Sequence, residues 1–557
     1  MQHFIISGLL VVALSGLAAA RLPDGRLHAN FPPRPIAHLT GTPPSDGVVH
    51  ARTGATIPPY DTTYYFEQLI DHNNPGLGTF QQRYWHTWEF YEPGGPIILM
   101  TPGESNADGF DFYLTNATIP GQIAQQQNGA TIVLEHRFYG YSNPFSDLSV
   151  ASLRYHTIQQ AIDDLEYFAD NVELPMPGGD AVGPDQAPWI MVGGSYAGAL
   201  TSWTMVDKPG LFWAGYSSSG VAESIVDFWA YFEPIRQFMP QNCSVDVQAV
   251  IAHVDLVFTT GTPSEINALK AQFGMSNVPH LEDVAGALRN NLWDWQKLQP
   301  YTGPGAAFFR FCDALEVKNG VNAPATGWGL DHALSAWGSY FRNTYYSLVC
   351  GDSDPATCFG THDTSQSYWT DDTVGNDDRS WRWIVCNEVG FFQDSAPVNR
   401  PTLVSRLVQP IGDEVRNYAH QLFTSIGDNR FFLSDQRQCV QMFPGAFNSP
   451  SVPKADQTNA AYGGWNATVD RLFSVNGQRD PWRDATVSAE DATTVSTVNQ
   501  PVALGDGFHC SDLLTASAYY DATIARVQSQ ALASMKTWLE DWQPGGAERQ
   551  SAKWSPT

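Results

Sequence analysis

Three residues, in chain order a serine, an aspartate and a histidine, have the side chains needed for nucleophilic catalysis. Ser195 is the centre of VGGSYAGAL, Asp480 follows FSVNGQR, and His509 follows VALGDGF. A serine hydroxyl is a poor nucleophile near neutral pH, so it needs an imidazole base and a carboxylate that orients that base. This chain order, with each residue placed after an expected strand, is typical of hydrolases built on an α/β sheet. We therefore predict a catalytic triad of Ser195, Asp480 and His509.

The small residues around the serine predict a sharp turn from a strand into a helix. Gly193, Gly194, Ala197 and Gly198 allow such a turn to be tight and to expose the hydroxyl of Ser195 at the sheet edge. The common pattern is G-x-S-x-G, and Ala197 replaces its last glycine. Alanine is small enough to fit, although taken alone a Gly-Gly-Ser turn is also compatible with a purely structural role.

The backbone beside the serine is expected to stabilise negative charge on a reacting carbonyl oxygen. The first N–H group of the following helix, that of Tyr196, points toward such an oxyanion. A second donor should come from the loop after an earlier strand, where TPGES stands, and Gly103 and Glu104 are the candidates there.

Several other residues could take part instead. Asp484 is the rival for the triad acid, because it lies four residues after Asp480. His136 precedes the serine and is flanked by Glu135 and Arg137, which favours a structural ion pair. Cys510 adjoins the histidine but has no strand-to-helix turn of its own, so a buried or disulfide-bonded cysteine is expected. Asp506 and Asp512, which flank the histidine, are interpreted as solvated loop residues.

The elements that must position these residues alternate between strands and helices. Continuous apolar runs ended by Gly or Pro predict buried strands, and a 3.6-residue apolar period predicts helices. Strand, helix and strand in this order imply a parallel sheet with right-handed crossovers. The expected strands are 95–103, 129–140, 187–194, 471–477 and 500–507, and the expected helices are 156–172, 244–258, 264–273 and 519–542.

The block from about 224 to 440 breaks this alternation and contains six of the seven cysteines. We interpret it as a mainly helical cap inserted into an α/β domain, since 557 residues exceed what one hydrophobic core usually serves. The expected organisation is a signal peptide (1–20), a Pro-rich linker or pro-segment (21–59), the first part of the α/β domain (60–223), the cap (224–440), the second part (441–545) and a polar tail (546–557).

The N-terminal residues predict secretion. Residues 1–20 have an apolar run of signal-peptide length that ends in three alanines. No later run is expected to be long and apolar enough to cross a bilayer, so no membrane association is expected. Residues 21–59 hold eight prolines and four arginines, a composition that builds no core. A basic pro-segment of this kind could dock on an acidic body.

The cysteines and the glycosylation sequons agree with an oxidising compartment. Seven cysteines without C-x-x-C spacing favour disulfides plus one odd thiol over a zinc site, and Cys350 with Cys358 would close a short loop. Asn116, Asn242 and Asn466 stand in N-x-S/T sequons and could carry glycans.

A net charge of −27 makes nucleic acid and anionic membranes unsuitable partners. Two interpretations remain open. The charge keeps a secreted protein soluble, or it reflects adaptation to acid, where many carboxylates become neutral and self-repulsion falls.

At this point the chain resembles a known family, the serine peptidases of lysosomal Pro-Xaa carboxypeptidase and dipeptidyl peptidase II, with their secreted fungal acid prolyl endoproteases. The resemblance runs in collinear order from about residue 60 to 545, and TPGESNADG and GFHCSDL look most like the fungal branch. The matching stretches are YFEQLIDHNNPGLGTFQQRYW, ILMTPGESNADGF, IVLEHRFYGYSNPF, WIMVGGSYAGALTSW, WRWIVCNEVGFF, GGWNATVDRLF, NGQRDPWRD and GDGFHCSDL.

The resemblance implies an α/β-hydrolase fold with a largely helical inserted cap, the same triad, and cleavage on the carboxyl side of proline in acid. The family's turn is commonly G-G-S-Y-G-G, so Ala197 bears only on the geometry of the turn. A proline ring is compact, apolar and without an N–H, so a pocket selects it by shape and aromatic contact. Trp482 is placed to help wall such a pocket, with a core tryptophan as the alternative. Glu388 is a second substrate-binding candidate, with a structural acid as the alternative.

Acid activity requires an explanation, because an ordinary imidazole is largely protonated below about pH 6. Either the site lowers the pKa of His509, or a minor neutral fraction works.

The sequence thus predicts a secreted serine peptidase, placed outside the cell or in an acidic vacuolar or lysosomal-type compartment. Its expected substrates are proline-containing peptides or proteins, and no metal or organic cofactor is expected. The alternatives are a Pro-Xaa carboxypeptidase or dipeptidyl exopeptidase, an esterase or lipase of the same fold, and a non-catalytic binding protein.

Overall fold

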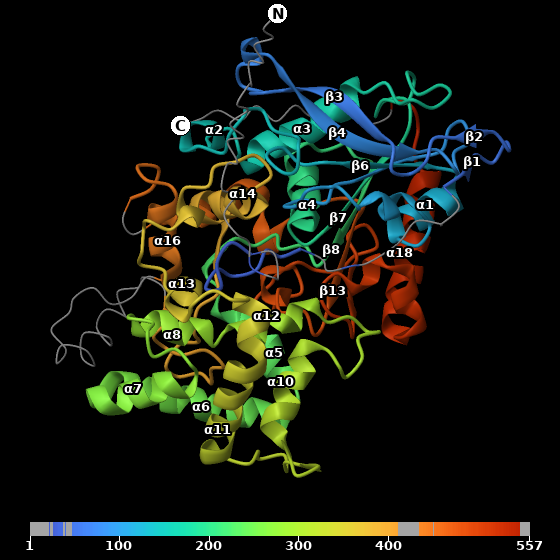
Figure 1. Cartoon of the computed structure of the whole chain (residues 1–557). Coiled ribbons are helices and arrows are strands. Elements are labelled where there is room, and N and C mark those ends of the chain that lie inside the picture. The colour runs from blue at the N-terminus through green and yellow to red at the C-terminus, as the bar shows by residue number, and fades with distance from the viewer. Residues whose placement is uncertain are drawn as a thin grey trace, which may run out of the picture.

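A single large sheet organises the fold of the computed structural model, which describes residue 22 and residues 26–36, 39, 47–409, 434–448 and 451–545. Within these residues the sheet has eight strands in the order β14-β13-β8-β7-β5-β6-β4-β3 (Figure 1). Strands β3 and β4 form an antiparallel hairpin, and β4 runs antiparallel to β6. From β6 to β14 every neighbouring pair is parallel. The expected signal peptide and polar tail lie outside the described residues.

The strands of the central sheet are short and mostly apolar. All four residues of β5 and all five of β6 are buried, as expected for parallel strands covered on both faces. The strands are β3 (Thr63–Leu69), β4 (Thr79–Thr87), β5 (Ile97–Met100), β6 (Ala130–Leu134), β7 (Trp189–Gly194), β8 (Ala214–Ser218), β13 (Leu472–Gly477) and β14 (Val502–Gly505).

Helices cover both faces of the sheet. α1 (Ile119–Gln127) and α18 (Ala522–Glu540) pack together, with α1 against β5 and β6 and α18 against β8, β13 and β14. α3 (Ile158–Asn171) and α4 (Tyr196–Asp207) also contact each other, α3 against β3 and α4 against β7 and β8. The strand order, the parallel register and these two helical layers are those of an α/β-hydrolase fold. The fold expected from the sequence is therefore confirmed.

The chain between β8 and β13 is mainly helical. The boundaries 224 and 440 of the cap stay a prediction. The principal elements are β9 (Ile225–Asp227), α5 (Phe232–Phe238), α6 (Gln241–Thr260), α7 (Pro263–Gln272), α8 (Leu281–Ala287), α9 (Asn290–Trp293), α10 (Ala307–Glu316), α11 (Leu330–Tyr340), α12 (Tyr346–Cys350), α13 (Pro355–Phe359), α14 (Asp377–Ile384), β12 (Gly390–Phe392), α16 (Ser434–Met442) and α17 (Ala455–Tyr462). Of these, helices α5–α8 and α10–α12 gather at one end of the molecule (Figure 1).

Small two-stranded sheets also occur in the described ranges. β1 (Val49–His50) pairs with β2 (Thr56–Ile57), and β10 (Val317–Lys318) pairs with β11 (Val321–Asn322), both antiparallel. β9 and β12 pair in parallel, which joins the first residues after β8 to the end of the π-helical turn Val385–Val389.

Disulfides cross-link the helices and loops of the inserted block. Cys243 of α6 bonds Cys312 of α10, Cys350 bonds Cys358, and Cys386 bonds Cys439. The short Cys350–Cys358 loop was expected, and the odd thiol is the buried Cys510.

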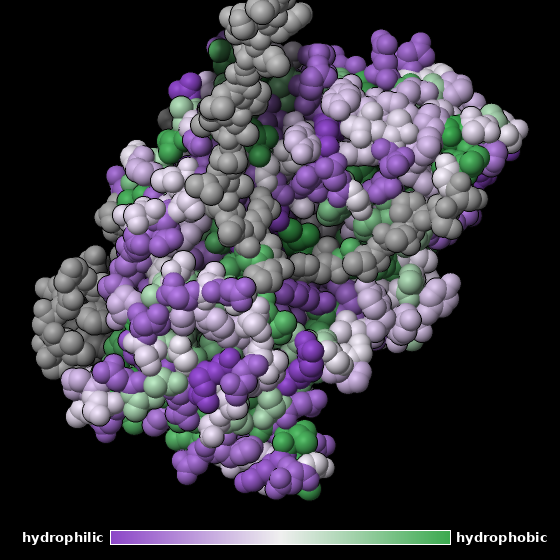
Figure 2. Space-filling model, viewed as in Figure 1, coloured by the Kyte–Doolittle hydropathy of each residue, from purple (hydrophilic) through white to green (hydrophobic). Residues whose placement is uncertain are grey.

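One helix in the described part of the chain, α6, is long and apolar enough to cross a membrane by length and composition. Its apolar side chains instead pack in the hydrophobic core, because they are at most 1% exposed at Val247, Val250, Ile251 and Val254. We interpret α6 as a core helix. On the face drawn in Figure 2, polar residues cover most of the coloured surface and apolar residues are scattered.

Candidate active site

Ser195 occupies the turn between β7 and α4. Its backbone has φ 59° and ψ −123°, a conformation that costs about 1–3 kcal/mol for a residue with a side chain. The neighbours must be small: a Cβ on Gly193 would lie 2.0 Å from the carbonyl oxygen of Ala197, and one on Gly198 would lie 2.9 Å from the Cα of Gly220. The strand-to-helix turn therefore has the form expected from the sequence, and Ala197 fits within it.

Asp480 and His509 form a buried hydrogen-bonded pair. His509 Nδ1 lies 2.9 and 3.0 Å from the two carboxylate oxygens of Asp480, and both side chains are fully buried. The carboxylate is held in place by the backbone N–H of Trp482, which donates to Asp480 Oδ1 at 2.9 Å. The two residues follow β13 and β14, which pair in parallel, so their loops leave the sheet at the same edge.

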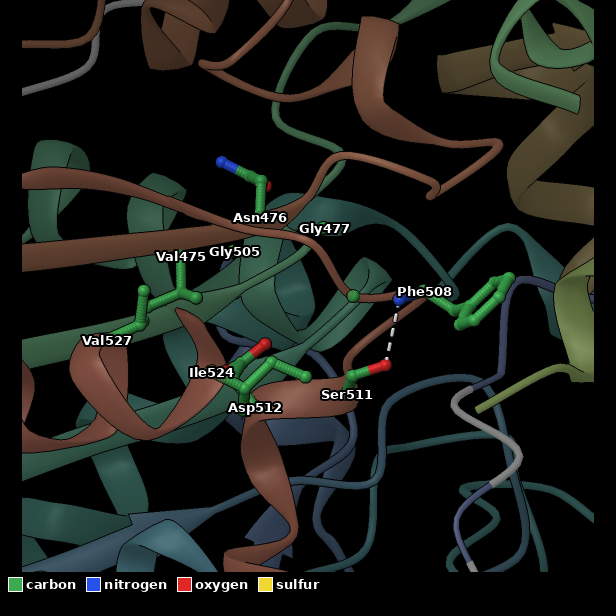
Figure 3. Close-up of a pocket in the computed structure, with 10 residues that line it drawn as sticks. Val475, Asn476, Gly477, Gly505, Phe508, Ser511, Asp512, Ile524 and Val527 are labelled. Atoms are coloured by element: carbon green, nitrogen blue, oxygen red, sulfur yellow. Dashed lines mark hydrogen bonds between the residues drawn. The ribbon is translucent and has the colours of Figure 1, made fainter. Parts of the chain in front are cut away.

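The loop that carries His509 folds over the serine turn. The backbone N–H of Phe508 donates to Ser511 Oγ at 2.9 Å, which closes a tight turn around His509 (Figure 3). A Cβ on Gly194 would meet Leu513 Cδ1 at 2.7 Å and Cys510 Sγ at 3.2 Å. The residues that follow His509 thus lie against the serine turn, and the structure brings the three predicted residues to one edge of the sheet.

The second nitrogen of His509 contacts a residue from the N-terminal region. His509 Nε2 lies 2.8 Å from the carbonyl oxygen of Pro35, while Ser195 Oγ, which is buried, has no hydrogen-bond partner among the described residues. Ile36 lines the pocket that contains Ser195, together with Met100, Thr101, Pro102, Glu104, Phe110, Tyr113, Gly194 and Leu513. The hydroxyl and the imidazole are therefore present in one site but are not hydrogen-bonded to each other in this state.

The two contacts of His509 define its protonation. A carbonyl oxygen and a carboxylate both only accept, so each ring nitrogen donates and the ring is an imidazolium. Burial lowers the pKa of His509, but the charge of Asp480 outweighs burial and holds that pKa well above its ordinary value. In this state His509 has no free lone pair with which to accept a proton from Ser195.

The predicted oxyanion donors lie around the same pocket. Tyr196 is the first residue of α4, so its N–H has no partner within the helix. The N–H of Gly103 donates to Thr101 Oγ1 at 3.3 Å in this state. Glu104 is 1% exposed, and burial raises the pKa of its carboxyl to about 7. The roles of these three residues in an oxyanion hole stay a prediction.

Trp482 lies beside the histidine in an aromatic cluster with Phe228, Tyr231 and Phe391. Its ring centroid is 6.4 Å from that of His509, and its indole is 1% exposed. Its Nε1 donates to Gln296 Oε1 at 2.8 Å. Trp482 is thus a core tryptophan in this state that adjoins His509.

Glu388 does not line the pocket of Ser195. Its carboxylate accepts the backbone N–H of Ile158 at 3.2 and 3.3 Å, at the first residue of α3. Burial raises the pKa of Glu388 to about 7. These contacts favour the structural acid over the substrate-binding residue, because the side chain is committed to a helix N-terminus.

The rival residues are engaged elsewhere. Asp484 pairs with Arg483 at 3.8 Å, whereas His509 contacts Asp480. His136 Nδ1 donates to the carbonyl oxygen of Arg137 (2.7 Å), its Nε2 lies 3.2 Å from Tyr196 Oη, and burial lowers its pKa to about 4. Asp512 is buried rather than solvated, because it accepts from Tyr216 Oη at 2.6 Å and Ser218 Oγ at 2.8 Å. Asp506 pairs with Arg479 at 2.7 Å near the surface, and Cys510 is a buried free thiol.

The sequon asparagines differ in exposure. Asn116 and Asn466 are exposed, whereas Asn242 is half-buried and its Oδ1 accepts the N–H of Cys243 at 2.9 Å. Glycosylation at all three stays a prediction.

One group of side chains in the described ranges, His280, Glu282 and His362, has ligand atoms within 4.8 Å of one another. The two imidazoles stack with centroids 3.5 Å apart and an interplanar angle of 13°. Parallel stacked rings cannot both direct their in-plane lone pairs at one ion, so we assign no metal role to this group.

Sequence reasoning missed four residues at this site. Pro35 contacts His509, Gln296 bonds Trp482, and Arg34 pairs with Asp377 and donates to the carbonyl oxygen of Glu104. Arg34 and Pro35 lie in the stretch that the sequence predicts to be a linker or pro-segment, because a Pro-rich stretch without long apolar residues does not predict a packed core. The consecutive acids Asp377 and Asp378, which begin α14, are the signal that could have suggested a binding site for a basic group.

Comparison with known proteins identifies the family of this chain. The family model described as serine carboxypeptidase S28 matches residues 68–530. The serine protease vicPa of Bipolaris victoriae is 36% identical over 86% of this chain and 88% of its own length. A probable extracellular serine carboxypeptidase of Arthroderma benhamiae is 29% identical over 83% of this chain and 64% of its own length. The human thymus-specific serine protease is 24% identical over 86% of each chain.

A solved proline iminopeptidase from Mycobacterium smegmatis aligns with 85% of this chain and 100% of its own length, at 10% identity and a TM-score of 0.32. That similarity is too low to bear on function. The family match spans most of the chain and includes the serine turn, the aspartate and the histidine, so this chain belongs to the serine carboxypeptidase S28 family and is a serine peptidase.

Proposed function

We propose that this serine peptidase is secreted and hydrolyses peptide bonds on the carboxyl side of proline within longer chains. The observation that carries the proposal is that the chain's own Pro35 places its carbonyl oxygen 2.8 Å from His509 Nε2. The next residue, Ile36, lines the pocket of Ser195. A proline therefore already lies at His509, and the apolar residue that follows it lies in the pocket of Ser195.

The proposed reaction uses the three residues in their usual roles. With the Pro35 carbonyl displaced, neutral His509 takes the proton of Ser195 Oγ as this oxygen attacks the carbonyl carbon of the substrate proline. The imidazolium is stabilised by Asp480 and then protonates the leaving amine. Water, deprotonated by His509, hydrolyses the acyl-enzyme and restores the serine.

A short chain of hydrogen bonds supports Trp482 as part of the proline site. Trp482 Nε1 donates to Gln296 Oε1, and Gln296 Nε2 donates at 2.9 Å to the carbonyl oxygen of Arg34, the residue before Pro35. Tyr231 Oη also donates to Gln296 Oε1, at 3.1 Å. An aromatic wall that is fixed in this way is suited to a flat, apolar ring without an N–H.

The course of the N-terminal segment favours endopeptidase over exopeptidase action. Residues 26–34 precede Pro35 at the site, and Ile36 and Leu39 follow it, with Leu39 packed in an apolar cluster that includes Met100 and Tyr113. A site that accepts polypeptide on both sides of His509 does not require a free terminus. A Pro-Xaa carboxypeptidase or a dipeptidyl peptidase cuts near a chain end. Its active form would therefore need the site to be closed on one side of His509.

Acid activity and secretion are parts of the same proposal. Buried carboxyl groups with raised pKa values, such as Glu104 and Glu388 at about 7, favour the folded state in acid. The raised pKa of His509 supports the second of the two explanations for acid activity, a minor neutral fraction. Three disulfides among the described residues suit an oxidising compartment, and one relative is named an extracellular enzyme.

Product mapping tests the proposal. A long proline-containing protein is digested at about pH 4–5, and all products are identified by mass spectrometry. We expect internal cuts after proline that vanish with Ser195→Ala. Loss of terminal residues alone would show an exopeptidase, and serine-dependent cuts without proline would overturn the assigned specificity.

A further inference from the structure

The segment 26–36 is packed into the protein rather than loosely attached. His28, Ala29, Asn30 and Phe31 are all at most 3% exposed. Asn30 Nδ2 donates to the carbonyl oxygens of Asp283 (2.9 Å) and Phe359 (2.7 Å), at α8 and α13. Burial of this extent is more than a linker needs, so the segment has a binding site of its own.

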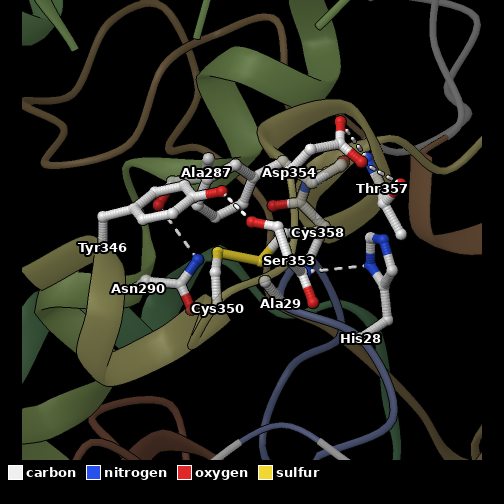
Figure 4. The surroundings of a disulfide bond; sticks show 12 residues. His28, Ala29, Ala287, Asn290, Tyr346, Cys350, Ser353, Asp354, Thr357 and Cys358 are labelled. Carbon is white, nitrogen blue, oxygen red and sulfur yellow. Dashed lines mark hydrogen bonds between the residues drawn. A yellow bond between two sulfur atoms is a disulfide. The ribbon is translucent and has the colours of Figure 1, made fainter. Parts of the chain in front are cut away.

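The inserted block supplies most of that binding site. His28 Nε2 lies 3.1 Å from the carbonyl oxygen of Gly360, and His28 and Ala29 lie beside the Cys350–Cys358 disulfide (Figure 4). Arg26 donates to Asn290 Oδ1 at 2.6 Å, and its guanidinium lies 5.2 Å from the ring centroid of Trp293. The disulfide-closed loop and helices α8 and α9 thus hold the first half of the segment.

Arg34 fixes the second half at the catalytic edge. Its Nε lies 2.9 Å from Asp378 Oδ1, and its Nη1 lies 3.4 Å from Asp377 Oδ2 and also donates to the carbonyl oxygen of Glu104. The arginine side chain is only 15% exposed. Because hydrogen bonds between ionised partners are the strong ones, this contact is the main polar anchor next to Pro35.

The anchor places Pro35 where it disables the base. The Pro35 carbonyl accepts from His509 Nε2, so this nitrogen carries a proton and cannot receive one from Ser195. The same carbonyl contacts the histidine rather than Ser195, whose Oγ has no hydrogen-bond partner in the described part of the chain. The segment therefore lies at the site as an inhibitor and not in the geometry of a substrate about to be attacked.

We propose that residues 26–36 are an intramolecular inhibitor that fills the substrate cleft, with Arg34 held by Asp377 and Asp378 as its anchor and the Pro35 carbonyl bound to the catalytic histidine. The protein becomes active when this segment is displaced or removed by proteolysis. The inference rests on the serine peptidase site and does not depend on the preference for proline.

Labelling of the serine tests the inference directly. The intact chain, with its N-terminus verified by mass, reacts with a fluorophosphonate probe, which reports access to an activated serine and not sequence preference. We expect slow labelling of the intact wild type and about tenfold faster labelling of Arg34→Ala, since the variant loses charge-assisted bonds. Asp378→Asn, which weakens the same anchor from the other side, is expected to act in the same direction.

Arg52→Ala is the matched control. Arg52 also belongs to the N-terminal region, but it pairs with Glu92 at 3.3 Å and with the carbonyl oxygen of Gln125 at 2.6 Å. We expect it to label like the wild type. Equal labelling rates for wild type, Arg34→Ala and Asp378→Asn would overturn the proposal, as would a fully active enzyme that retains residues 26–36 in place.

A peptide supplied separately gives an independent readout. Enzyme from which limited proteolysis has removed the segment is assayed with the synthetic peptide RLHANFPPRPI, residues 26–36. We expect inhibition competitive with substrate, weakened about tenfold when the peptide carries Arg34→Ala. Absence of inhibition by the wild-type peptide would contradict the proposal.

Discussion

His509 Nδ1 and the carboxylate of Asp480 form a two-oxygen contact, at 2.9 and 3.0 Å, in which both side chains are fully buried. The backbone N–H of Trp482 holds one of these oxygens, so the acid is fixed before any substrate binds. This contact orients the imidazole with Nε2 toward the bound segment. It also raises the pKa of His509 against the opposing effect of burial.

Loss of the Asp480 charge should abolish most of the activity. Asp480→Asn keeps the shape of the side chain but stabilises the wrong tautomer of His509 and no longer stabilises the imidazolium. We expect kcat to fall by about 10³–10⁴-fold with KM little changed, measured on enzyme freed of the N-terminal segment. Asp484→Asn is the control, and an equal loss in that variant would identify Asp484 as the acid.

Trp482→Phe should weaken selection of proline. The substitution removes the hydrogen bond to Gln296 and part of the aromatic wall next to His509. We expect kcat/KM for Pro-Xaa peptides to fall about tenfold, and more than for Ala-Xaa peptides. Trp213→Phe is the control, because Trp213 also donates an indole hydrogen bond, to Trp538 O at 2.7 Å, but lies beside α18. We expect its selectivity for proline to match that of the wild type. Unchanged selectivity in Trp482→Phe would place the proline site elsewhere.

The folded state should be more stable at pH 5 than at pH 8. Burial raises the pKa of Glu104 and Glu388 to about 7 and of Asp512 to about 6, whereas the ordinary values are about 4. The folded state therefore holds these protons more tightly, and the stability they contribute is complete below about pH 4 and lost as pH rises through 6–7.

Thermal unfolding followed by circular dichroism measures this effect. We expect Tm to fall on the order of 5 °C between pH 5 and pH 8. Glu388→Gln, which cannot ionise, should show a smaller fall. A Tm that rises over this range would show that other groups dominate.

The initial rate should increase with pH in the acid range. Because Asp480 holds the pKa of His509 above its ordinary value, the neutral base is a minor species in acid. We expect kcat/KM of segment-free enzyme to rise about tenfold per pH unit between pH 4 and 6. A plateau that is already reached at pH 4 would instead show that the open site lowers the pKa of His509.

The predicted sheet and triad depended on strong local patterns. The buried strands β5, β6 and β7 are continuous or nearly continuous apolar runs, and the predicted triad residues follow three of the strands in the sheet. β8, with the sequence AGYSS, has no such run, so its pairing between β7 and β13 becomes evident only from tertiary structure. Local periodicity predicts an element when burial is continuous, and it fails where small polar residues pack.

The contacts of the N-terminal segment could not be predicted for a related reason. Pro35 and His509 are separated by 474 positions, and neither the prolines nor Arg34 form a local pattern that points to a cleft. The sequence suggested that a basic segment could dock on an acidic body, and this contact does join a basic residue to acidic ones. The partners of Arg34, Asp377 and Asp378, are identified only by the structure. For Glu388 the sequence allowed either a substrate-binding or a structural role. The hydrogen bond that its carboxylate accepts from the first residue of α3 favours the structural role.

The measurement that tests the central claim most directly compares matched peptides that differ only in Pro-Xaa or Ala-Xaa at the cleavage position. Segment-free wild-type enzyme and its Ser195→Ala variant are assayed by quantifying both products. The account predicts that the proline peptide is cleaved on the order of a hundredfold faster, corresponding to about 2.7 kcal/mol, and that all cleavage is lost in Ser195→Ala. Equal rates for the two peptides, or cleavage that persists without Ser195, would contradict it.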